Sequence, residues 1–320
     1  MTSFDVLRSA QTRRAIALPA QFTARAPARE ATLEGFRQRN AVLDYIFYNL
    51  RALSAAEATD LADHYAAEGA ILAVGPSAAP SLARYASFAE FAAEGLPDHA
   101  TIVVAGVGSS ALGAAAFARD VADAIGEPVL AVVSGYGLAD LLTEAIGGAF
   151  LFGALNSLRT LFEPLDDFTT HRFDFAGTSL PAAEAGARAS YDVRTLVALL
   201  GSGLKVDRLI GHSKGNLVIS EALYALGETA PARSATLARE AWIVTISAAI
   251  TMPDAFRDVT DIMGQFDGFG AMNSRPSIRI DHWVSGAWHH TNTELTLPLR
   301  PVPVTETLRA VMKARAAAPI

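Results

Sequence analysis

Hydrophobic residues recur with two different periods along this chain, and the change of period separates its first hundred residues from the rest. From about Glu30 to Ala70, apolar residues return every three or four positions, as on one face of an α-helix: Phe36, Val42, Leu43, Ile46, Phe47 and Leu50. A second helix is predicted from Ala55 to Glu68, with Ser54 as its N-cap. Residues 1–30 contain two prolines and no clear period, so we expect them to be irregular. Residues 1–95 are therefore predicted to be a helical N-terminal region that packs on the remainder or caps it.

From Thr101 onward, short continuous apolar runs alternate with helical segments. The runs 101–105 and 128–133 have the character of buried parallel strands and flank a predicted helix at 111–125, which together make a βαβ unit. The alternation continues with a helix at 181–200, strands at 208–210, 242–246, 259–263 and 278–284, and a last helix at 308–316. This order predicts an α/β fold with a mostly parallel sheet flanked by helices over residues 96–320.

One connection within this region is unusually long. A helix is predicted at 138–146, and the segment 147–180 follows, in which an apolar run at 150–162 precedes Glu163, Asp166 and Asp167. Long connections in compact domains often cover a binding site, so 147–180 is a possible lid, with an ordinary loop carrying its own small core as the alternative.

Composition narrows the class of protein. With 320 residues, of which 51% are hydrophobic and 18% charged, the chain can bury a sizeable core and is not disordered. A net charge of −7 gives no basic footprint for nucleic acid, and the arginines near the start are expected to be solvated. The absence of cysteine excludes disulfides, thiolate metal sites and a cysteine nucleophile. Without a signal-like segment or a sufficiently long apolar run, we expect a soluble, cytoplasmic protein with no integral membrane segment, and homo-oligomers remain possible.

The most informative stretch is Gly211-His212-Ser213-Lys214-Gly215, which lies between a predicted strand and a predicted helix. A serine hydroxyl is a weak nucleophile and must stand at a sharp turn where a base can reach it. The flanking positions must be small for such a turn, and the following helix aims free N–H groups at developing negative charge. The plain alternative is an ordinary glycine turn.

A nucleophilic Ser213 requires a base and an acid, and later strands end in both. Asp267 follows the strand at 259–263, and the pair His289-His290 follows the strand at 278–284. We favour His289 as the base and keep His290 as the alternative. Other carboxylates in reach along the chain are Asp254, Asp258 and Asp261, the last of which lies within a predicted strand.

Three motifs in this order resemble the α/β-hydrolase superfamily, of the serine esterase and lipase type, including polyhydroxyalkanoate-depolymerase-like members: Gly211-x-Ser213-x-Gly215, Gly264-x-x-Asp267 and Gly286-x-x-His289. The resemblance begins at about Thr101, and the preceding residues match no family known to us. It implies Ser213 as nucleophile, His289 as base and then acid, and Asp267 as the residue that orients the imidazole. It also implies an oxyanion hole made by the backbone N–H groups of Lys214 and of Val107 or Gly108. Trp288 departs from the family, which commonly has a small residue before its histidine.

The sequence thus predicts a serine hydrolase that cleaves a carboxylic ester of an apolar acyl group through an acyl-enzyme, without cofactor or metal. Its substrate would be a small-molecule or polymeric ester, as for a lipase, an esterase or a polyester depolymerase. A thioesterase or acyltransferase would use the same triad. The spacing Gly106-x-Gly108-x-x-Ala111 also fits a dinucleotide fingerprint, but the next strand does not end in the acidic residue that an NAD-dependent oxidoreductase needs. A non-catalytic hydrolase-fold binding module is the third possibility.

Overall fold

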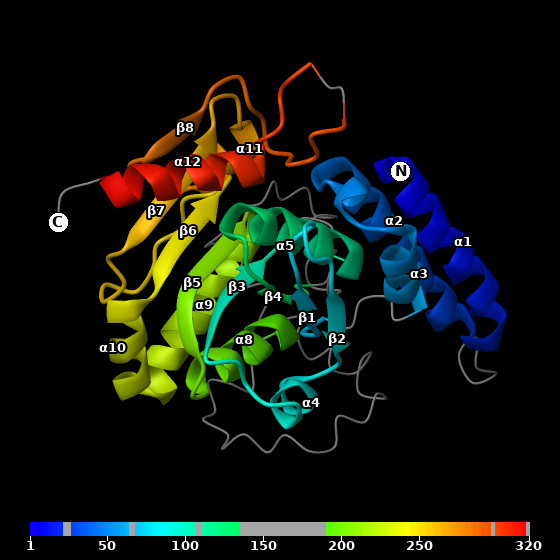
Figure 1. Ribbon diagram of the computed structural model, residues 1–320, viewed down its shortest axis with the longest axis horizontal. Helices are drawn as coiled ribbons and strands as arrows, with labels where there is room; N and C mark the ends of the chain where they lie inside the picture. Colours follow the sequence, from blue (N-terminus) through cyan, green and yellow to red (C-terminus); the bar gives the residue numbers. More distant parts are fainter. Residues whose placement is uncertain (22–26, 64–67, 107–109, 135–189, 296–297, 318–320) are drawn as a thin grey trace.

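A single sheet organises the computed structural model, which describes residues 1–21, 27–63, 68–106, 110–134, 190–295 and 298–317 (Figure 1). Eight strands form this sheet in the order β2-β1-β4-β3-β5-β6-β7-β8. Their bounds are β1 (Ile71–Val74), β2 (Leu82–Tyr85), β3 (His99–Val104), β4 (Val129–Val132), β5 (Lys205–His212), β6 (Trp242–Ile246), β7 (Val259–Gly264) and β8 (His282–Val284).

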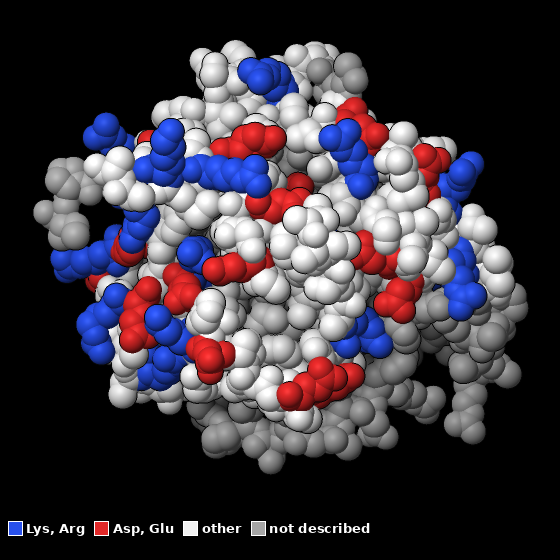
Figure 2. Space-filling model, in the orientation of Figure 1, with Lys and Arg blue, Asp and Glu red and all other residues white. Residues whose placement is uncertain are grey.

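Helices surround the sheet in the described part of the chain. They are α1 (Ser3–Gln21), α2 (Pro27–Phe47), α3 (Ala55–Asp63), α4 (Phe88–Ala93), α5 (Ala111–Ile125), α8 (Tyr191–Gly201), α9 (Lys214–Thr229), α10 (Pro231–Glu240), α11 (Gly268–Asn273) and α12 (Val304–Ala317), with a short 3₁₀ turn at Leu50–Ala52. No helix described here is both long and apolar enough to cross a membrane. On the face shown in Figure 2, acidic and basic side chains are interspersed.

The sheet separates two apolar cores. Successive residues of a strand point to opposite faces, so in β3 the side chain of Val103 joins one core and those of Ile102 and Val104 join the other. Buried residues of α1, α2, α3, α5 and α12 line the first core, and those of α4, α8, α9 and α10 line the second. Because β4 and β6 are covered on both faces, their sequences are almost continuously apolar.

The strand order reverses direction between β3 and β5. Strands β4, β3, β5, β6, β7 and β8 run parallel, whereas β1 is antiparallel to both of its neighbours. After β3 the chain passes to β4 on one side, and it later returns to β5 on the other. In open sheets, ligands bind beyond the carboxyl ends of the strands at such a switch point.

The predicted α/β fold and the N-terminal helical segment are confirmed. Helix 111–125 and strand 242–246 have the predicted bounds, and the other predicted strands and the last helix differ by a few residues at their ends. Helix α3 is described over Ala55–Asp63, with Ser54 accepting from the Glu57 N–H (3.2 Å), and residues 64–67 of the predicted helix lie outside the described residues. The predicted helix at 138–146, the possible lid at 147–180 and the first part of the helix at 181–200 lie outside the described residues.

Three expectations about the first 95 residues were wrong. Residues 3–21 are helical, not irregular, and the buried face of α1 carries polar groups that conceal its period: Ser3 and Arg14. Arg14 forms a buried ion pair with Glu34 (2.8 Å), so this arginine is not solvated. Residues 71–74 and 82–85, expected within the helical region, are strands of the main sheet. Their four-residue length gives too short a pattern to be distinguished from helix by period alone.

Candidate active site

Ser213 lies at the turn between β5 and α9 in a strained backbone conformation. Its φ and ψ are 53° and −121°, and in the described chain Ser247 is the one other non-glycine residue with positive φ. Such a conformation costs about 1–3 kcal/mol and persists where surrounding bonds enforce it. Here the Ser213 N–H donates to the Ile246 carbonyl (2.8 Å), and the Ser213 carbonyl accepts from the Asn216 N–H (3.0 Å). The side chain is thereby directed toward the carboxyl edge of the sheet.

Glycine is required on three sides of this turn. A Cβ on Gly215 would lie 2.7 Å from the Val104 carbonyl carbon and overlap its oxygen. A Cβ on Gly211 would lie 2.9 Å from the Ile219 side chain and overlap that of Asn216. At Gly106, in the loop after β3, a Cβ would lie 2.8 Å from that of Ser213. The close approach of β3, β5 and α9 that the motif predicts is therefore present.

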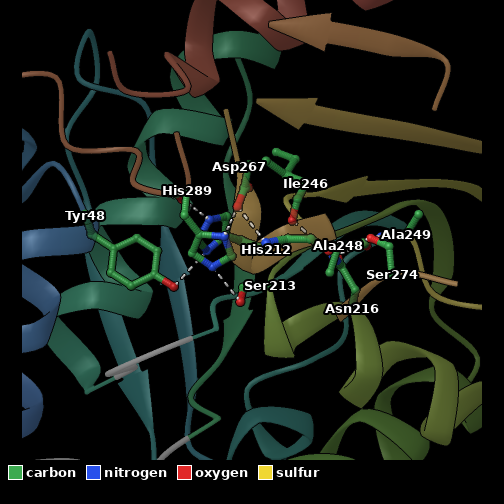
Figure 3. A network of polar contacts seen from close by, with 11 residues as sticks. Tyr48, His212, Ser213, Asn216, Ile246, Ala248, Ala249, Asp267, Ser274 and His289 are labelled. Carbon is green, nitrogen blue, oxygen red and sulfur yellow. Dashed lines mark hydrogen bonds and ion pairs between the residues drawn. The ribbon is translucent and has the colours of Figure 1, made fainter. Parts of the chain in front are cut away.

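The structure brings the three predicted side chains together (Figure 3). His289 Nε2 lies 2.9 Å from Ser213 Oγ, and His289 Nδ1 lies 2.8 Å from Asp267 Oδ1. Because a carboxylate only accepts, the ring proton lies on Nδ1, and Nε2 is left to accept from the serine hydroxyl. All three side chains are buried, with 1–3% of each residue exposed. Serine, imidazole and carboxylate thus form one hydrogen-bonded series.

Local structure fixes the carboxylate and the imidazole separately. Asp267 caps α11, since its Oδ1 also accepts from the Gly270 N–H (2.6 Å). A side chain on Gly270 would come within 2.7 Å of Asp267 Oδ2, so this cap requires glycine. The loop that carries His289 leaves β8 through Gly286, which has a φ of 71° and donates to Gln265 Oε1 (3.0 Å).

Aromatic rings enclose the His289 imidazole. Phe47 and Phe269 approach it edge-on, each with its ring centroid 5.9 Å away, and Trp288 lies at 6.5 Å. Trp288, the departure from the family pattern, therefore forms part of this apolar wall.

The alternative base and acids do not reach Ser213. His290 is fully buried against Trp288, and neither of its ring nitrogens has a partner among the described residues. Burial, with the neighbouring His289, lowers the pKa of His290. Asp261 lies in β7 and bonds to Thr245, and Asp258 pairs with Arg315 on the surface. Asp254 is exposed.

Of the predicted oxyanion donors, Lys214 alone lies among the described residues. Lys214 begins α9, and a Cβ on Gly106 would lie 2.9 Å from the Lys214 nitrogen, so the loop after β3 lies directly against it. Val107 and Gly108, the other predicted donors, lie outside the described residues.

Three residues that belong to this site were not predicted. Asn216 Nδ2 donates to the carbonyls of Ile246 (3.0 Å) and Ala248 (2.9 Å), which attaches α9 to the end of β6. The Tyr48 hydroxyl lies 3.1 Å from His212 Nδ1, and the two residues form this hydrogen bond beside the imidazole of His289. The sequence offered one signal for two of these residues, since His212 lies within the serine motif and Asn216 directly follows it. Nothing in the sequence indicated Tyr48.

The amino end of α5, where a dinucleotide pyrophosphate would bind, is occupied by a carboxylate of the same chain. Asp44 on α2 accepts from the Ser110 N–H (3.0 Å), the Gly113 N–H (3.1 Å) and the Ser110 hydroxyl. Burial raises the pKa of Asp44 to about 8, an effect that these hydrogen bonds oppose. Among the described residues, no group of three or more His, Asp or Glu side chains converges as metal ligands.

Comparisons of the chain with models of protein families, with curated proteins and with solved structures gave no match.

Proposed function

We propose that this protein is a serine hydrolase of the α/β-hydrolase type that cleaves carboxylic esters of apolar acyl groups. The observation that carries the proposal is the hydrogen-bonded series Ser213–His289–Asp267 at the carboxyl edge of the sheet. The three groups follow β5, β7 and β8 in the chain order serine, acid, histidine, which is the order of this superfamily. The mostly parallel sheet flanked by helices is compatible with that fold.

The geometry suggests how these groups would act. Ser213 Oγ attacks the ester carbonyl carbon while His289 Nε2 takes its proton, and the backbone N–H of Lys214 faces the oxygen that becomes negative. His289 then gives the proton to the departing alkoxide, which leaves an acyl-enzyme on Ser213. A water molecule deprotonated by His289 attacks the acyl carbon, and the proton returns to Ser213 as the acid departs. Asp267 stabilises the imidazolium at each stage.

The surroundings favour an apolar acyl group. Phe47, Phe269 and Trp288 contact the imidazole, and Phe269 is still 46% exposed. Met272, on the same short helix α11, is 55% exposed. Apolar side chains beside the reacting atoms suit a lipid ester or a hydroxyalkanoate polyester better than a sugar or a peptide.

The rival from another reaction class is disfavoured by Asp44. A dinucleotide would place its pyrophosphate at the amino end of α5, and this position already holds the buried carboxyl group of Asp44. Thioester hydrolysis and acyl transfer use the same three groups and differ in which leaving group and which acceptor enter the site.

The test is a chain-length series of p-nitrophenyl esters with wild type and Ser213→Ala. We expect the wild type to turn over these esters and to be labelled by a fluorophosphonate. Ser213→Ala should do neither while its thermal unfolding changes little. Equal turnover by the two proteins, or an unlabelled and inactive wild type, would refute the proposal, and the second result would favour a binding module.

A further inference from the structure

Polar contacts form a chain from the loop after β3 to the backbone of the proposed base, and this chain passes through the N-terminal region. The Gly106 N–H donates to the Tyr48 hydroxyl (2.7 Å), and the same hydroxyl lies 3.1 Å from His212 Nδ1. His212 Nε2 lies 3.0 Å from the His289 carbonyl oxygen. Tyr48 and His212 have no exposed surface, and their rings meet edge to face at 5.5 Å (Figure 3).

The two ends of the chain determine where every proton lies. A backbone N–H only donates, and a carbonyl oxygen only accepts. The Tyr48 oxygen therefore accepts from Gly106 and donates its own proton to His212 Nδ1. This leaves the His212 proton on Nε2, which donates to the His289 carbonyl. Burial, assisted by the neighbouring His289, lowers the pKa of His212 to about 3, so the imidazole stays neutral and keeps this order.

The end of α2 also holds the loop that carries His289, through two hydrogen bonds to residues just after His289. The Phe47 carbonyl accepts from the Thr291 N–H (2.7 Å), and the Tyr45 carbonyl accepts from Asn292 Nδ2 (2.6 Å). Tyr48 continues the helix by one bond, because its N–H donates to the Asp44 carbonyl (2.8 Å). The residues after His289 are thus attached to the N-terminal helices and not only to the sheet.

We infer that Tyr48 is a positioning residue for the proposed hydrolase: its hydroxyl sets the loop after β3 at Gly106 and, through His212, the backbone of the base His289. The inference rests on the proposed function, since it assigns Tyr48 a part in that reaction. Tyr48 bonds to neither Ser213 nor Asp267, and its effect is to keep His289 Nε2 aligned with Ser213 Oγ. Through Tyr48, the first 95 residues take part in arranging the proposed active site.

The kinetic test compares Tyr48→Phe with Tyr85→Phe. Tyr85 is also buried and also donates a hydrogen bond through its hydroxyl, to Glu94 (2.8 Å), but it lies in the edge strand β2. We expect Tyr48→Phe to lower kcat for a p-nitrophenyl ester by about 10- to 100-fold with KM within about threefold, because small misplacements of reacting groups cost this much. Tyr85→Phe should retain the wild-type kcat.

A double variant tests whether the two residues act in series. His212→Gln alone breaks the link between Tyr48 and His289, so Tyr48→Phe/His212→Gln should lose no more kcat than the worse single variant. Losses that multiply would mean that the residues act independently, and this would overturn the inference.

Nitrogen-15 histidine spectra of the full chain test the proton order without any substrate. We expect one neutral imidazole protonated on Nε2 between about pH 5 and pH 8, and its signals should be absent from His212→Gln. In Tyr48→Phe the proton should stay on Nε2, because the His289 carbonyl still accepts it, and only the Nδ1 resonance should shift as it loses the hydrogen bond from Tyr48. A His212 protonated on Nδ1 overturns the inference, as does a Tyr48→Phe enzyme with the kcat of Tyr85→Phe. A wild type that hydrolyses no ester would instead refute the proposed function. The spectra would still show whether the hydrogen bonds from Gly106 through Tyr48 and His212 to His289 have the proposed direction.

Discussion

Asp267→Asn would separate two effects of the carboxylate in the proposed triad, namely fixing the tautomer of His289 and stabilising its positive charge. The N–H of Gly270 (2.6 Å) and Nδ1–H of His289 (2.8 Å) both reach the same oxygen, Oδ1. An asparagine that keeps its carbonyl oxygen there still accepts both bonds. Its amide nitrogen then takes the place of Oδ2, which has no partner among the described residues. The tautomer should survive, and the negative charge is lost.

The magnitude follows from that charge. Replacing a charge-assisted hydrogen bond by a neutral one costs about 1.5 kcal/mol, and a full ion pair near 4 Å is worth about 4 kcal/mol at an effective dielectric constant of about 20. At about 1.36 kcal/mol per factor of ten, kcat should fall by about 10- to 1,000-fold. Where the same substitution forces the wrong tautomer in serine proteases, the loss is about 10⁴-fold.

The assay is the kcat of p-nitrophenyl ester hydrolysis by wild type, Asp267→Asn and Asp267→Ala, with urea unfolding of each protein. The buried amide nitrogen of the asparagine should lower the free energy of unfolding by about 1–3 kcal/mol. A loss of kcat near 10⁴-fold would show that the amide turns its N–H toward His289, and the reasoning about Oδ1 would be wrong. A fall in kcat of less than about threefold would show that Asp267 has no role in catalysis.

Three further predictions test the geometry of the site. Gly215→Ala should lower the free energy of unfolding by about 1–3 kcal/mol in urea, because its Cβ overlaps β3, whereas Gly227→Ala in the same helix has its nearest neighbour at 3.8 Å and should stabilise by about 0.5–1 kcal/mol. His290→Phe should keep kcat within about threefold, and His289→Gln should lose at least about 10³-fold; equal losses would contradict the assignment of the base. Because the pKa of His212 falls from 6.5 to about 3 on folding, the unfolded chain binds the extra proton between these values, and the free energy of unfolding decreases as pH falls from 6.5 toward 3. In His212→Gln the free energy of unfolding should depend less on pH, by up to about 1.4 kcal/mol per pH unit, which urea unfolding at pH 5 and pH 7 would measure. The buried carboxyl groups of Asp44 and Asp120 contribute equally to both proteins and cancel in this comparison.

The parts of the fold that the sequence predicts are those whose cause is local. Strands such as β6 are buried on both faces, so they appear as unbroken apolar runs. The serine turn is recognisable because glycine is required on both sides of Ser213, and the predicted proximity of Asp267 and His289 follows from their common place after parallel strands. Neighbours in sequence determine the first two of these features, and the parallel order of β7 and β8 determines the third.

The parts that could not be predicted depend on distant partners. The buried face of α1 includes Arg14, which is tolerated there because Glu34 of α2 neutralises it. Nothing near Tyr48 in sequence indicates that its hydroxyl will meet His212, which lies 164 positions further along the chain. Polar contacts of this kind become visible only after packing has fixed where α2 ends.

The glycine-rich turn after β3 shows how such a distant partner can decide between two functions. Its spacing suits a dinucleotide as well as an oxyanion loop, and the difference lies in what satisfies the first N–H groups of α5. Asp44 does so from 66 positions earlier in the chain, and a side chain on Gly113 would overlap this carboxylate. Four residues later, Tyr48 takes the N–H of Gly106. One face of α2 therefore both fills the position that a pyrophosphate would need and supports the loop beside Ser213, so the N-terminal helices and the proposed ester chemistry depend on the same contacts.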